Sequence, residues 1–528
     1  MTRSIAAQPP ITRVGEQARL PRSAAPALGW GLSLAALIVG MFMSVLDTSI
    51  VNVAIPTMQN EFGTTAQDIQ WISTAYTLCL GVVVPASAWL GDRLCMKRMY
   101  VIALVGFSVA SALCGLAWDL NSMIVFRIVQ AIPGGVLPVI CLTMVYKIVP
   151  REKIGLAMGM YGLGIVVAPA IGPTLGGYLV EYVSWRLIFD INVPVGLLGA
   201  LAAYFVLPKL PSVRTPRFDM PGFLAVAAGL FALLLAFSEG TDWGWSSYRV
   251  LMLIAGGLLC LALFVVIELE ADAPLLDVRI FRYWPFLNSL LLIVVLTVGL
   301  FSTVYYVPVF LQEGQGMEAF DAGLLLLPQA LVMLVLMPLA GRLYDRFGPR
   351  WLAVSGLAIT GIATLLLAGI NPDMTRSEVI WWLMLRAFGL GLSIMPIMTG
   401  GLSVLPPAAV NHGSAFNNLL QRVSGALGLA VLTALATVTQ SQDLADRSGL
   451  VGGVTATNDP RIVAMQQQGT LGLYPMWERT QLDALATSYS NVFLILAALT
   501  FVGMILAFFL RSGPAPATGA GHAAVEVG

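Results

Sequence analysis

Long apolar stretches, each ended by a short polar segment, recur along almost the whole chain. An apolar run of about 20 residues is long enough to cross the hydrocarbon core of a bilayer as a helix. Fourteen such runs fit between the polar segments, which predicts an all-α polytopic membrane protein. The predicted helices cover residues 29–55, 68–90, 99–118, 122–147, 153–180, 187–207, 220–239, 250–270, 285–312, 319–341, 350–370, 377–404, 409–439 and 487–510.

The overall composition agrees with lipid as the solvent. Of the 528 residues, 58% are hydrophobic and 11% are charged, whereas soluble domains carry about 25% charged residues. The net charge of zero argues against nucleic acid as a partner. The two histidines and five cysteines are scattered, so we expect no metal site, no disulfide framework and no cofactor.

Lysine and arginine predict which side each loop faces. Of the 28 basic residues, 19 fall in the two tails and in alternate loops, six fall in the other loops and three lie within apolar runs. Since cytoplasmic loops carry the excess of positive charge, both termini are predicted to be cytoplasmic. Segments 1–28 and 512–528 are predicted to be disordered tails. Segment 440–486 is predicted to be an extracytoplasmic loop, irregular or with a short amphipathic element.

One polar pattern occurs twice. An Asp-Arg pair follows the second and the tenth apolar runs, and in each case a further helix and then an arginine inside an apolar run come next. The residues are Asp92, Arg93 and Arg127 in the first copy and Asp345, Arg346 and Arg386 in the second, 35 and 41 residues from aspartate to arginine.

The repeat predicts two six-helix bundles, residues 29–207 and 285–511, joined by a segment 208–284 that contributes two extra helices. Parallel repeats of this kind place the substrate path at their interface, near the bilayer midplane.

Several further motifs carry a family resemblance over residues 29–510. They are Leu46-Asp47-Thr48 to Pro56 in the first helix, Arg127 to Gln130 in the fourth, Gly172-Pro173 with Gly176-Gly177 in the fifth, Trp185-Arg186 to Gly196 in the sixth, and Pro274 to Arg282 before the ninth. In this order the motifs resemble those of the major facilitator superfamily, and within it the fourteen-helix drug:proton antiporters, the group of EmrB and QacA. The resemblance implies a proton-coupled multidrug exporter, linked to antibiotic resistance, in the bacterial cytoplasmic membrane. We expect it to act as a monomer.

The sequence departs from the family pattern at several positions. Ala88 and Cys95 stand where the first Asp-Arg loop usually has glycine, so we expect a looser turn than in the copy with Gly341 and Gly348. Helix 13 reads Gln421-Arg422, where relatives often have the reverse order.

Asp47 is the leading candidate for proton coupling. A carboxylate within an apolar helix costs roughly 2.5–3.5 kcal/mol unless it faces the bundle interior or water. The alternative is a structural acid paired with Asn52 or a buried arginine. Arg127, with Gln130 one turn away, is the expected cation beside it, in a coupling or a purely structural role, since arginine does not deprotonate.

Three other groups have candidate roles. The two Asp-Arg pairs are interpreted as a cytoplasmic gate, or simply as topogenic charges. The antiporter-motif residues Gly172, Pro173, Gly176 and Gly177 are interpreted as close packing between helices. Asp190 is a possible second proton site, or a partner of Arg186 four residues earlier.

Substrate contacts are assigned to side chains near the presumed centre. Apolar, adaptable side chains suit an export cavity, although each is also at home in a packed core. The candidates are Phe42, Met43, Asn52, Gln130, Tyr305, Tyr306 and Met395.

These observations predict secondary active export by alternating access. The expected partners are a small hydrophobic or amphipathic substrate, protons and the lipid bilayer. Two alternatives within the same fold remain: an exporter of a lipid, siderophore or other metabolite, and a facilitator or importer without proton coupling. A membrane enzyme or receptor is disfavoured, because the sequence shows no nucleophile–base pair, no phosphate loop and no soluble domain.

Overall fold

The computed structural model describes residues 29–210, 218–271, 274–406, 409–454 and 470–510. Within these ranges the regular structure is entirely helical. In lipid every backbone N–H and C=O group needs a partner within the chain, and a helix supplies it locally. The two predicted tails, residues 1–28 and 512–528, lie outside the described residues.

Fourteen helical segments of the described ranges are long and apolar enough to span a bilayer, as predicted. They are α1 (Trp30–Phe62), α3 (Trp71–Leu94), α4 (Met96–Gly115), α5 (Leu120–Ile148), α6 (Ile154–Tyr182), α7 with α8 (Leu187–Asp190 and Asn192–Val206), α9 (Met220–Trp243), α10 (Tyr248–Glu270), α11 (Trp284–Glu313), α12 with α13 (Ala319–Leu324 and Leu327–Phe347), α14 (Pro349–Leu367), α15 (Arg376–Ser403), α16 (Val410–Val454) and α18 (Thr470–Ala507). Short helices α2 (Ala66–Ile69), η1 (Arg151–Lys153) and η2 (Val278–Arg282) lie between them.

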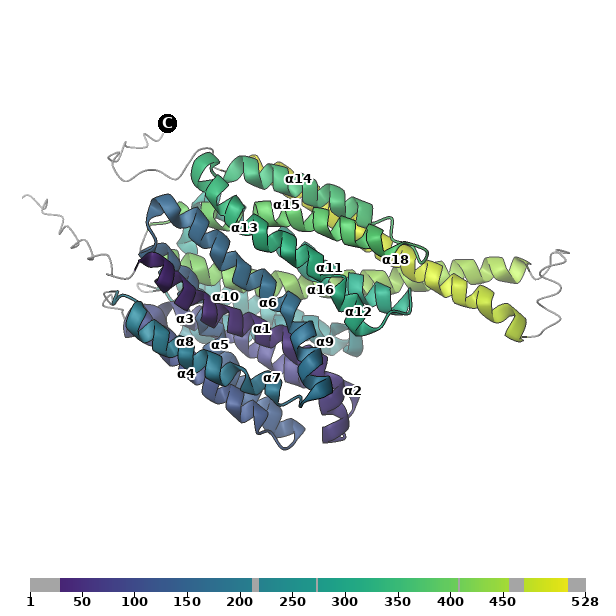
Figure 1. Ribbon diagram of the computed structural model, residues 1–528, viewed down its shortest axis with the longest axis horizontal. Helices are drawn as coiled ribbons and strands as arrows, with labels where there is room; N and C mark the ends of the chain where they lie inside the picture. Colours follow the sequence, from purple (N-terminus) through teal and green to yellow (C-terminus); the bar gives the residue numbers. More distant parts are fainter. Residues whose placement is uncertain (1–28, 211–217, 272–273, 407–408, 455–469, 511–528) are drawn as a thin grey trace, which may run out of the picture.

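The helices form two bundles, α1–α8 and α11–α18, which we call the N-half and the C-half (Figure 1). Two helices connect them. Helix α9 packs against α3 and α16, where Leu78, Leu234 and Val423 meet. Only 17% of the apolar window of α10 is buried, so this helix exposes most of its surface to lipid.

The two halves are joined at one end of the molecule. We call this the inner end; it is where α1 begins and α18 ends (Figure 1), and it is predicted to be cytoplasmic. There, one cluster of buried apolar side chains includes Met158 of the N-half together with Met337 and Met395 of the C-half. At the opposite, outer end, each half has a separate cluster, around Phe189 in the N-half and Phe493 in the C-half. The conformation is therefore closed at the inner end.

Helix–helix contact at the inner end depends on glycine. A Cβ atom at Gly155 of α6 would overlap the backbone oxygen of Gly341 in α13, and a Cβ atom at Gly341 would overlap that of Gly155. One turn further along, Gly159 lies equally close to the backbone of Met337. Because glycine has no side chain, the two halves are in contact backbone to backbone.

Segment 440–486 differs from the predicted irregular loop. Helix α16 continues to Val454 and α18 begins at Thr470, so that both helices extend beyond the rest of the bundle (Figure 1). Polar contacts join the pair: Arg447 Nη1 lies 3.7 Å from Asp483 Oδ2, and Arg447 Nη2 donates to Thr487 Oγ1 at 3.2 Å. The outer turns of these two helices are polar, so a hydropathy pattern does not reveal that they are helical.

The extended hairpin is also tied to the loop between α14 and α15. Arg479 of α18 donates to both carboxylate oxygens of Asp373, one of them at 2.9 Å. These hydrogen bonds hold the pKa of the Asp373 carboxyl below its ordinary value. Both side chains are exposed, so the pair adds little stability.

Candidate functional site: a buried ion pair among the N-half helices

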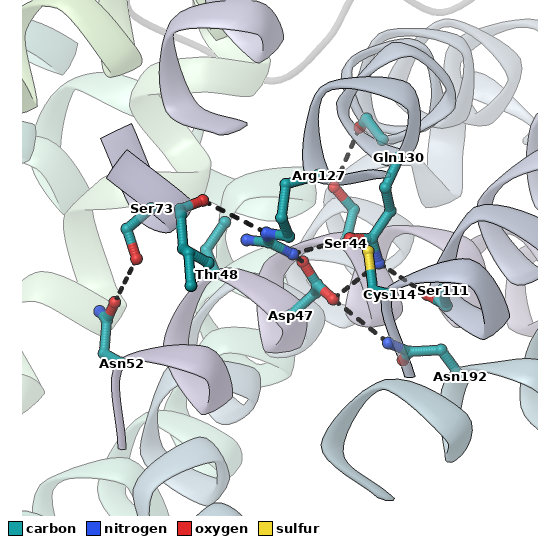
Figure 2. Close-up of polar contacts among 12 residues, drawn as sticks. Ser44, Asp47, Thr48, Asn52, Ser73, Ser111, Cys114, Arg127, Gln130 and Asn192 are labelled. Atoms are coloured by element: carbon teal, nitrogen blue, oxygen red, sulfur yellow. Dashed lines mark hydrogen bonds and ion pairs between the residues drawn. The ribbon is translucent and has the colours of Figure 1, made fainter. Parts of the chain in front are cut away.

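Asp47 is fully buried in α1 and forms an ion pair with Arg127 of α5. Asp47 Oδ2 lies 2.5 Å from Arg127 Nη1, and the exposed fractions of the two side chains are 0% and 1%. Its other oxygen, Oδ1, accepts from Gln130 Nε2 at 2.9 Å and from Asn192 Nδ2 at 3.3 Å (Figure 2). Both carboxylate oxygens are thus engaged by donors, which offsets the cost of burying the charge.

Arg127 is held on several sides. Its Nη1 also donates to Gln130 Oε1 at 2.7 Å, and its Nε donates to the backbone oxygen of Ile72 at 3.4 Å. The guanidinium lies over the ring of Tyr76, 3.7 Å from its centroid, in a cation–π contact. Arg127 is therefore fixed between α3 and α5 and presents one nitrogen to Asp47.

Gln130 connects the ion pair to α4. Its Nε2 donates to Ser111 Oγ at 2.6 Å, and Cys114 Sγ donates to its Oε1 at 3.6 Å (Figure 2). Side chains and backbone from α1, α3, α4, α5 and α8 thus belong to the polar network around this carboxylate. The carboxylate charge of Asp47 lies at the centre of this set of contacts.

Helices α5 and α15, which carry Arg127 and Arg386, both begin with a capping box. At α5, Asp119 accepts from the backbone N–H of Ser122, and at α15, Thr375 and Glu378 form the matching pair. Such caps satisfy the free N–H groups of a first helical turn. The internal repeat therefore includes the N-terminal caps of these two helices.

The repeat is chemically asymmetric at its centre. Arg386, the C-half counterpart of Arg127, donates to the backbone oxygen of Gly299 at 2.6 Å and to Thr364 Oγ1 at 3.3 Å. Within the described residues, Asp47–Arg127 is the ion pair with both partners buried. Among the described residues, the acid beside a buried arginine is thus found in the N-half.

Asp345 joins the two halves at the inner end. Its carboxylate accepts from the backbone N–H groups of Gly155 at 2.9 Å and Leu156 at 3.2 Å, at the start of α6. A carboxylate at a helix N-terminus satisfies free donors and complements the helix dipole. Asp345 of the C-half therefore caps a helix of the N-half.

The other predicted gate residues are placed differently. Both Asp-Arg pairs lie in the last turn of a helix, α3 or α13, rather than in a loop after it, because these helices run further than hydropathy indicates. The guanidinium of Arg93 lies over Trp89 at 4.8 Å, and that of Arg346 lies over Phe347 at 5.2 Å. The side chain of Asp92 lies outside what the structure describes.

The turn after the first Asp-Arg pair has the same handedness as the second. Cys95 has φ 66° and Gly348 has φ 77°. Positive φ is unusual for a residue with a side chain. Cys95 thus adopts a positive φ like the glycine, but its ψ of 119° differs from the −177° of Gly348.

The glycine motif of α6 packs beside α1, the helix that carries Asp47. Cβ atoms at Gly172 and Gly176 would overlap Ser49 and Ile50 of α1. Gly177 has open space around its Cβ position, and the side chain of Pro173 is not among those described. Two of the four motif residues thus set the distance between α1 and α6.

Asp190 does not pair with Arg186. Arg186 Nη1 instead lies 2.7 Å from Glu61 Oε1 of α1. Asp190 is partly buried against Gly115, where a Cβ atom would overlap its carboxylate. The residue of this segment that reaches Asp47 is Asn192, two positions later.

The structure does not gather the predicted substrate residues in one place. Met43 and Met395 belong to the inner-end core, and Tyr306 belongs to the C-half core, where its hydroxyl is 2.9 Å from Thr433 Oγ1. Gln130 belongs to the ion-pair network, and Asn52 is exposed and accepts from Ser73 at 3.1 Å. The remaining two are Phe42, which is half-buried, and Tyr305, which is exposed.

An open apolar groove is found at the surface of the C-half. It lies between α13 and α15, with a volume of about 410 Å³. Its lining is formed by Pro328, Leu331, Val332, Val335, Leu336, Met384 and Phe388.

Sequence reasoning missed several members of the site. Tyr76 and Ser111 are single polar residues in apolar helices, and nothing in their spacing relates them to Asp47. Asn192 stood within a family-like motif, which was a usable signal.

Comparison with known proteins agrees with this architecture. Residues 37–429 match the family model described as Major Facilitator Superfamily. The uncharacterized MFS-type transporter YhcA of Bacillus subtilis is 32% identical over 90% of this chain and 92% of its own. Lincomycin resistance protein LmrB of Listeria monocytogenes is 32% identical over 75% and 84%. Putative multidrug resistance protein MdtD of Escherichia coli is 31% identical over 80% and 88%.

Solved structures show the same fold. The proton:xylose symporter XylE has a TM-score of 0.59 at 13% identity, over 92% of this chain and 96% of its own. A bacterial homolog of the human lysosomal transporter Spinster has a TM-score of 0.54 at 19% identity, over 92% and 99%. The chain is a multi-pass membrane transporter, not an enzyme, and it belongs to the major facilitator superfamily.

Proposed function

We propose that this transporter exports hydrophobic and amphipathic compounds, including drugs, in exchange for protons. The observation that carries the proposal is the buried Asp47–Arg127 pair, whose carboxylate accepts hydrogen bonds from donors on two other helices, α5 and α8. The names of the relatives, which include lincomycin and multidrug resistance proteins, support drugs as substrates.

Protonation is the proposed trigger. A proton on Asp47 cancels its charge, and Arg127 then retains only the neutral acceptors Gln130 Oε1 and the backbone oxygen of Ile72. Contacts between α1, α5 and α8 therefore weaken together. Desolvation raises the cost of keeping Asp47 charged once Arg127 moves away, so protonation and rearrangement favour each other.

Packing provides a path from Asp47 to the inner end. Helix α1 is fitted to α6 at Gly172 and Gly176, and α6 touches α13 at Gly155 and Gly341. Asp345 caps the start of the same α6. In the proposed cycle, a movement of α1 is transmitted through α6 and opens the inner end.

The energy of a proton suffices for such export. One proton crossing about 100 mV supplies about 2.3 kcal/mol, and one pH unit adds about 1.4 kcal/mol. Together these sustain a substrate gradient on the order of several hundredfold.

The test is transport by purified protein in proteoliposomes with an imposed pH gradient. N-phenyl-1-naphthylamine and lincomycin serve as probes. We expect gradient-driven transport of at least one probe by the wild type, and none above empty liposomes by Asp47→Asn. Asp373→Asn, which removes an exposed acid at the outer end, is the matched control and should transport like the wild type.

Size-exclusion profiles establish that the Asn variant is folded. Gradient-driven transport by Asp47→Asn at the wild-type rate would contradict the role of Asp47. A wild type that moves neither probe would contradict the proposed substrate class.

A further inference from the structure

Three arginines lie in the middle of apolar runs, away from the helix ends, and one of them has no counter-group among the described residues. Arg127 is paired with Asp47, and Arg386 donates to Gly299 and Thr364. Arg422 of α16 has no hydrogen bond or ion pair in the part of the chain that the structure describes, and its Nε atom is buried without a partner.

Arg422 lies on α16, the C-half helix that packs against α3 and α5 of the N-half. It is within electrostatic reach of Tyr76 in α3 and Tyr161 in α6, which both belong to the N-half. The next residue along, Val423, packs against Leu78 and Leu234 in the contact that joins α16 to α3 and α9. Arg422 is therefore a C-half cation that faces N-half side chains.

A second unmatched donor lies beside it. Tyr76 is 1% exposed, and its hydroxyl has no hydrogen-bond partner among the described residues. The ring of the same tyrosine covers the guanidinium of Arg127. The buried hydroxyl of Tyr76 and the buried Nε atom of the half-buried Arg422 thus both lack a hydrogen-bond partner among the described residues.

The chemistry of arginine specifies which kind of partner Arg422 lacks, namely a hydrogen-bond acceptor. A guanidinium does not deprotonate in a protein and offers five N–H donors and no acceptor. A charged arginine in the middle of a membrane helix costs roughly 2.5–3.5 kcal/mol unless it is paired or hydrated. The acids of α11, α13 and α15, which are Glu313, Asp345 and Glu378, lie at helix ends rather than at this depth.

We propose that Arg422, together with the hydroxyls of Tyr76 and Tyr161, forms an anion-binding subsite between the two halves, and that favoured substrates carry an anionic group on an apolar body. This proposal rests on the proposed function. A carboxylate, sulfonate or phenolate would accept from the guanidinium in charge-assisted hydrogen bonds. The apolar body would remain among the surrounding apolar side chains.

Two probes with the same body test this assignment. 8-Anilino-1-naphthalenesulfonate differs from N-phenyl-1-naphthylamine by its sulfonate. Binding of each is measured by equilibrium dialysis to full-length protein in nanodiscs of zwitterionic lipid, with empty nanodiscs as the blank. We expect Arg422→Gln to weaken binding of the sulfonate at least about tenfold and to change binding of the neutral probe less than twofold.

Two further variants keep the result interpretable. Arg422→Lys retains the charge and should give an intermediate affinity for the sulfonate, because a lysine lacks the planar donor fork. Arg376→Gln removes an exposed arginine at the start of α15 and should bind both probes like the wild type. Unchanged sulfonate binding by Arg422→Gln, or a parallel loss of both probes, overturns the proposal.

An inorganic anion such as chloride is the alternative ligand for this subsite. If the subsite serves chloride, replacing gluconate by chloride at constant ionic strength should raise the melting temperature of the wild type but not of Arg422→Gln, and sulfonate binding should not depend on Arg422. That result overturns the substrate assignment. Because dialysis measures binding alone, it decides the proposal whether or not proton-driven transport of the neutral probe is found.

Discussion

At the scale of single residues, the central feature is a buried charge pair whose members depend on each other. Arg127 meets Asp47 at 2.5 Å with both side chains out of contact with solvent. Removing one partner of such a pair leaves an uncompensated charge, which typically costs 3–5 kcal/mol, whereas removing both charges costs much less.

Stability of the purified protein tests this dependence. Arg127→Gln alone should lower the melting temperature strongly, because Asp47 is left among donors that are too weak to compensate its charge. The double variant Asp47→Asn with Arg127→Gln should melt above the Arg127→Gln variant. Thermal unfolding of the wild type, the two single variants and the double variant at pH 7 measures the order, and a double variant that melts below both single variants would rule out the pair as the source of the effect.

This pair could be predicted from the sequence because charges are rare in apolar helices. An acid and an arginine in two such helices leave few other partners. Tyr76 and Ser111 could not be predicted in the same way, because tyrosine and serine are tolerated throughout membrane helices. Arg186 was one candidate partner of Asp190 at a spacing of four residues, but its guanidinium forms an ion pair with Glu61 of α1, which no local spacing indicates.

At the scale of helices, the contact of α6 with α13 closes the inner end. Asp345 is bound by two backbone N–H groups of α6, while Gly155 and Gly341 bring the two backbones together. The sequence indicated a gate at the Asp-Arg pairs. It did not indicate that Asp345 caps a helix of the opposite half, since no local pattern encodes a contact across 190 residues.

We expect the two copies of the gate to differ. Asp345→Asn should lose more transport than Asp92→Asn, because an amide at position 345 gives up the charge that two N–H groups now bind. Initial rates at matched expression in inverted membrane vesicles measure the difference. Equal losses of transport in the two variants would show that the two Asp-Arg copies do not differ in function.

At the scale of the whole molecule, the fourteen spans, the repeat and the two halves could be predicted, because they follow from hydropathy and from one recurring motif. The long hairpin of α16 and α18 could not, since its outer part is polar and helical. The orientation in the membrane remains a prediction from the distribution of basic residues.

Labelling of single cysteines tests this orientation. Ser212 and Thr455 lie outside the described residues, so charge alone places them on opposite sides. In a variant without the five native cysteines, an impermeant maleimide applied to intact cells should label cysteine at position 455 and leave position 212 unlabelled. Labelling of both positions would mean that the predicted topology is wrong.

The most direct test of the central claim is a proton flux that depends on both substrate and Asp47. Proteoliposomes that contain a pH-sensitive dye report proton movement when a transported probe is added on one side, without an imposed gradient. The wild type should move protons opposite to the probe. Asp47→Asn should move none while still exchanging labelled for unlabelled probe across the membrane. Probe transport by the wild type without any proton movement, or an undiminished proton flux in Asp47→Asn, would contradict the account.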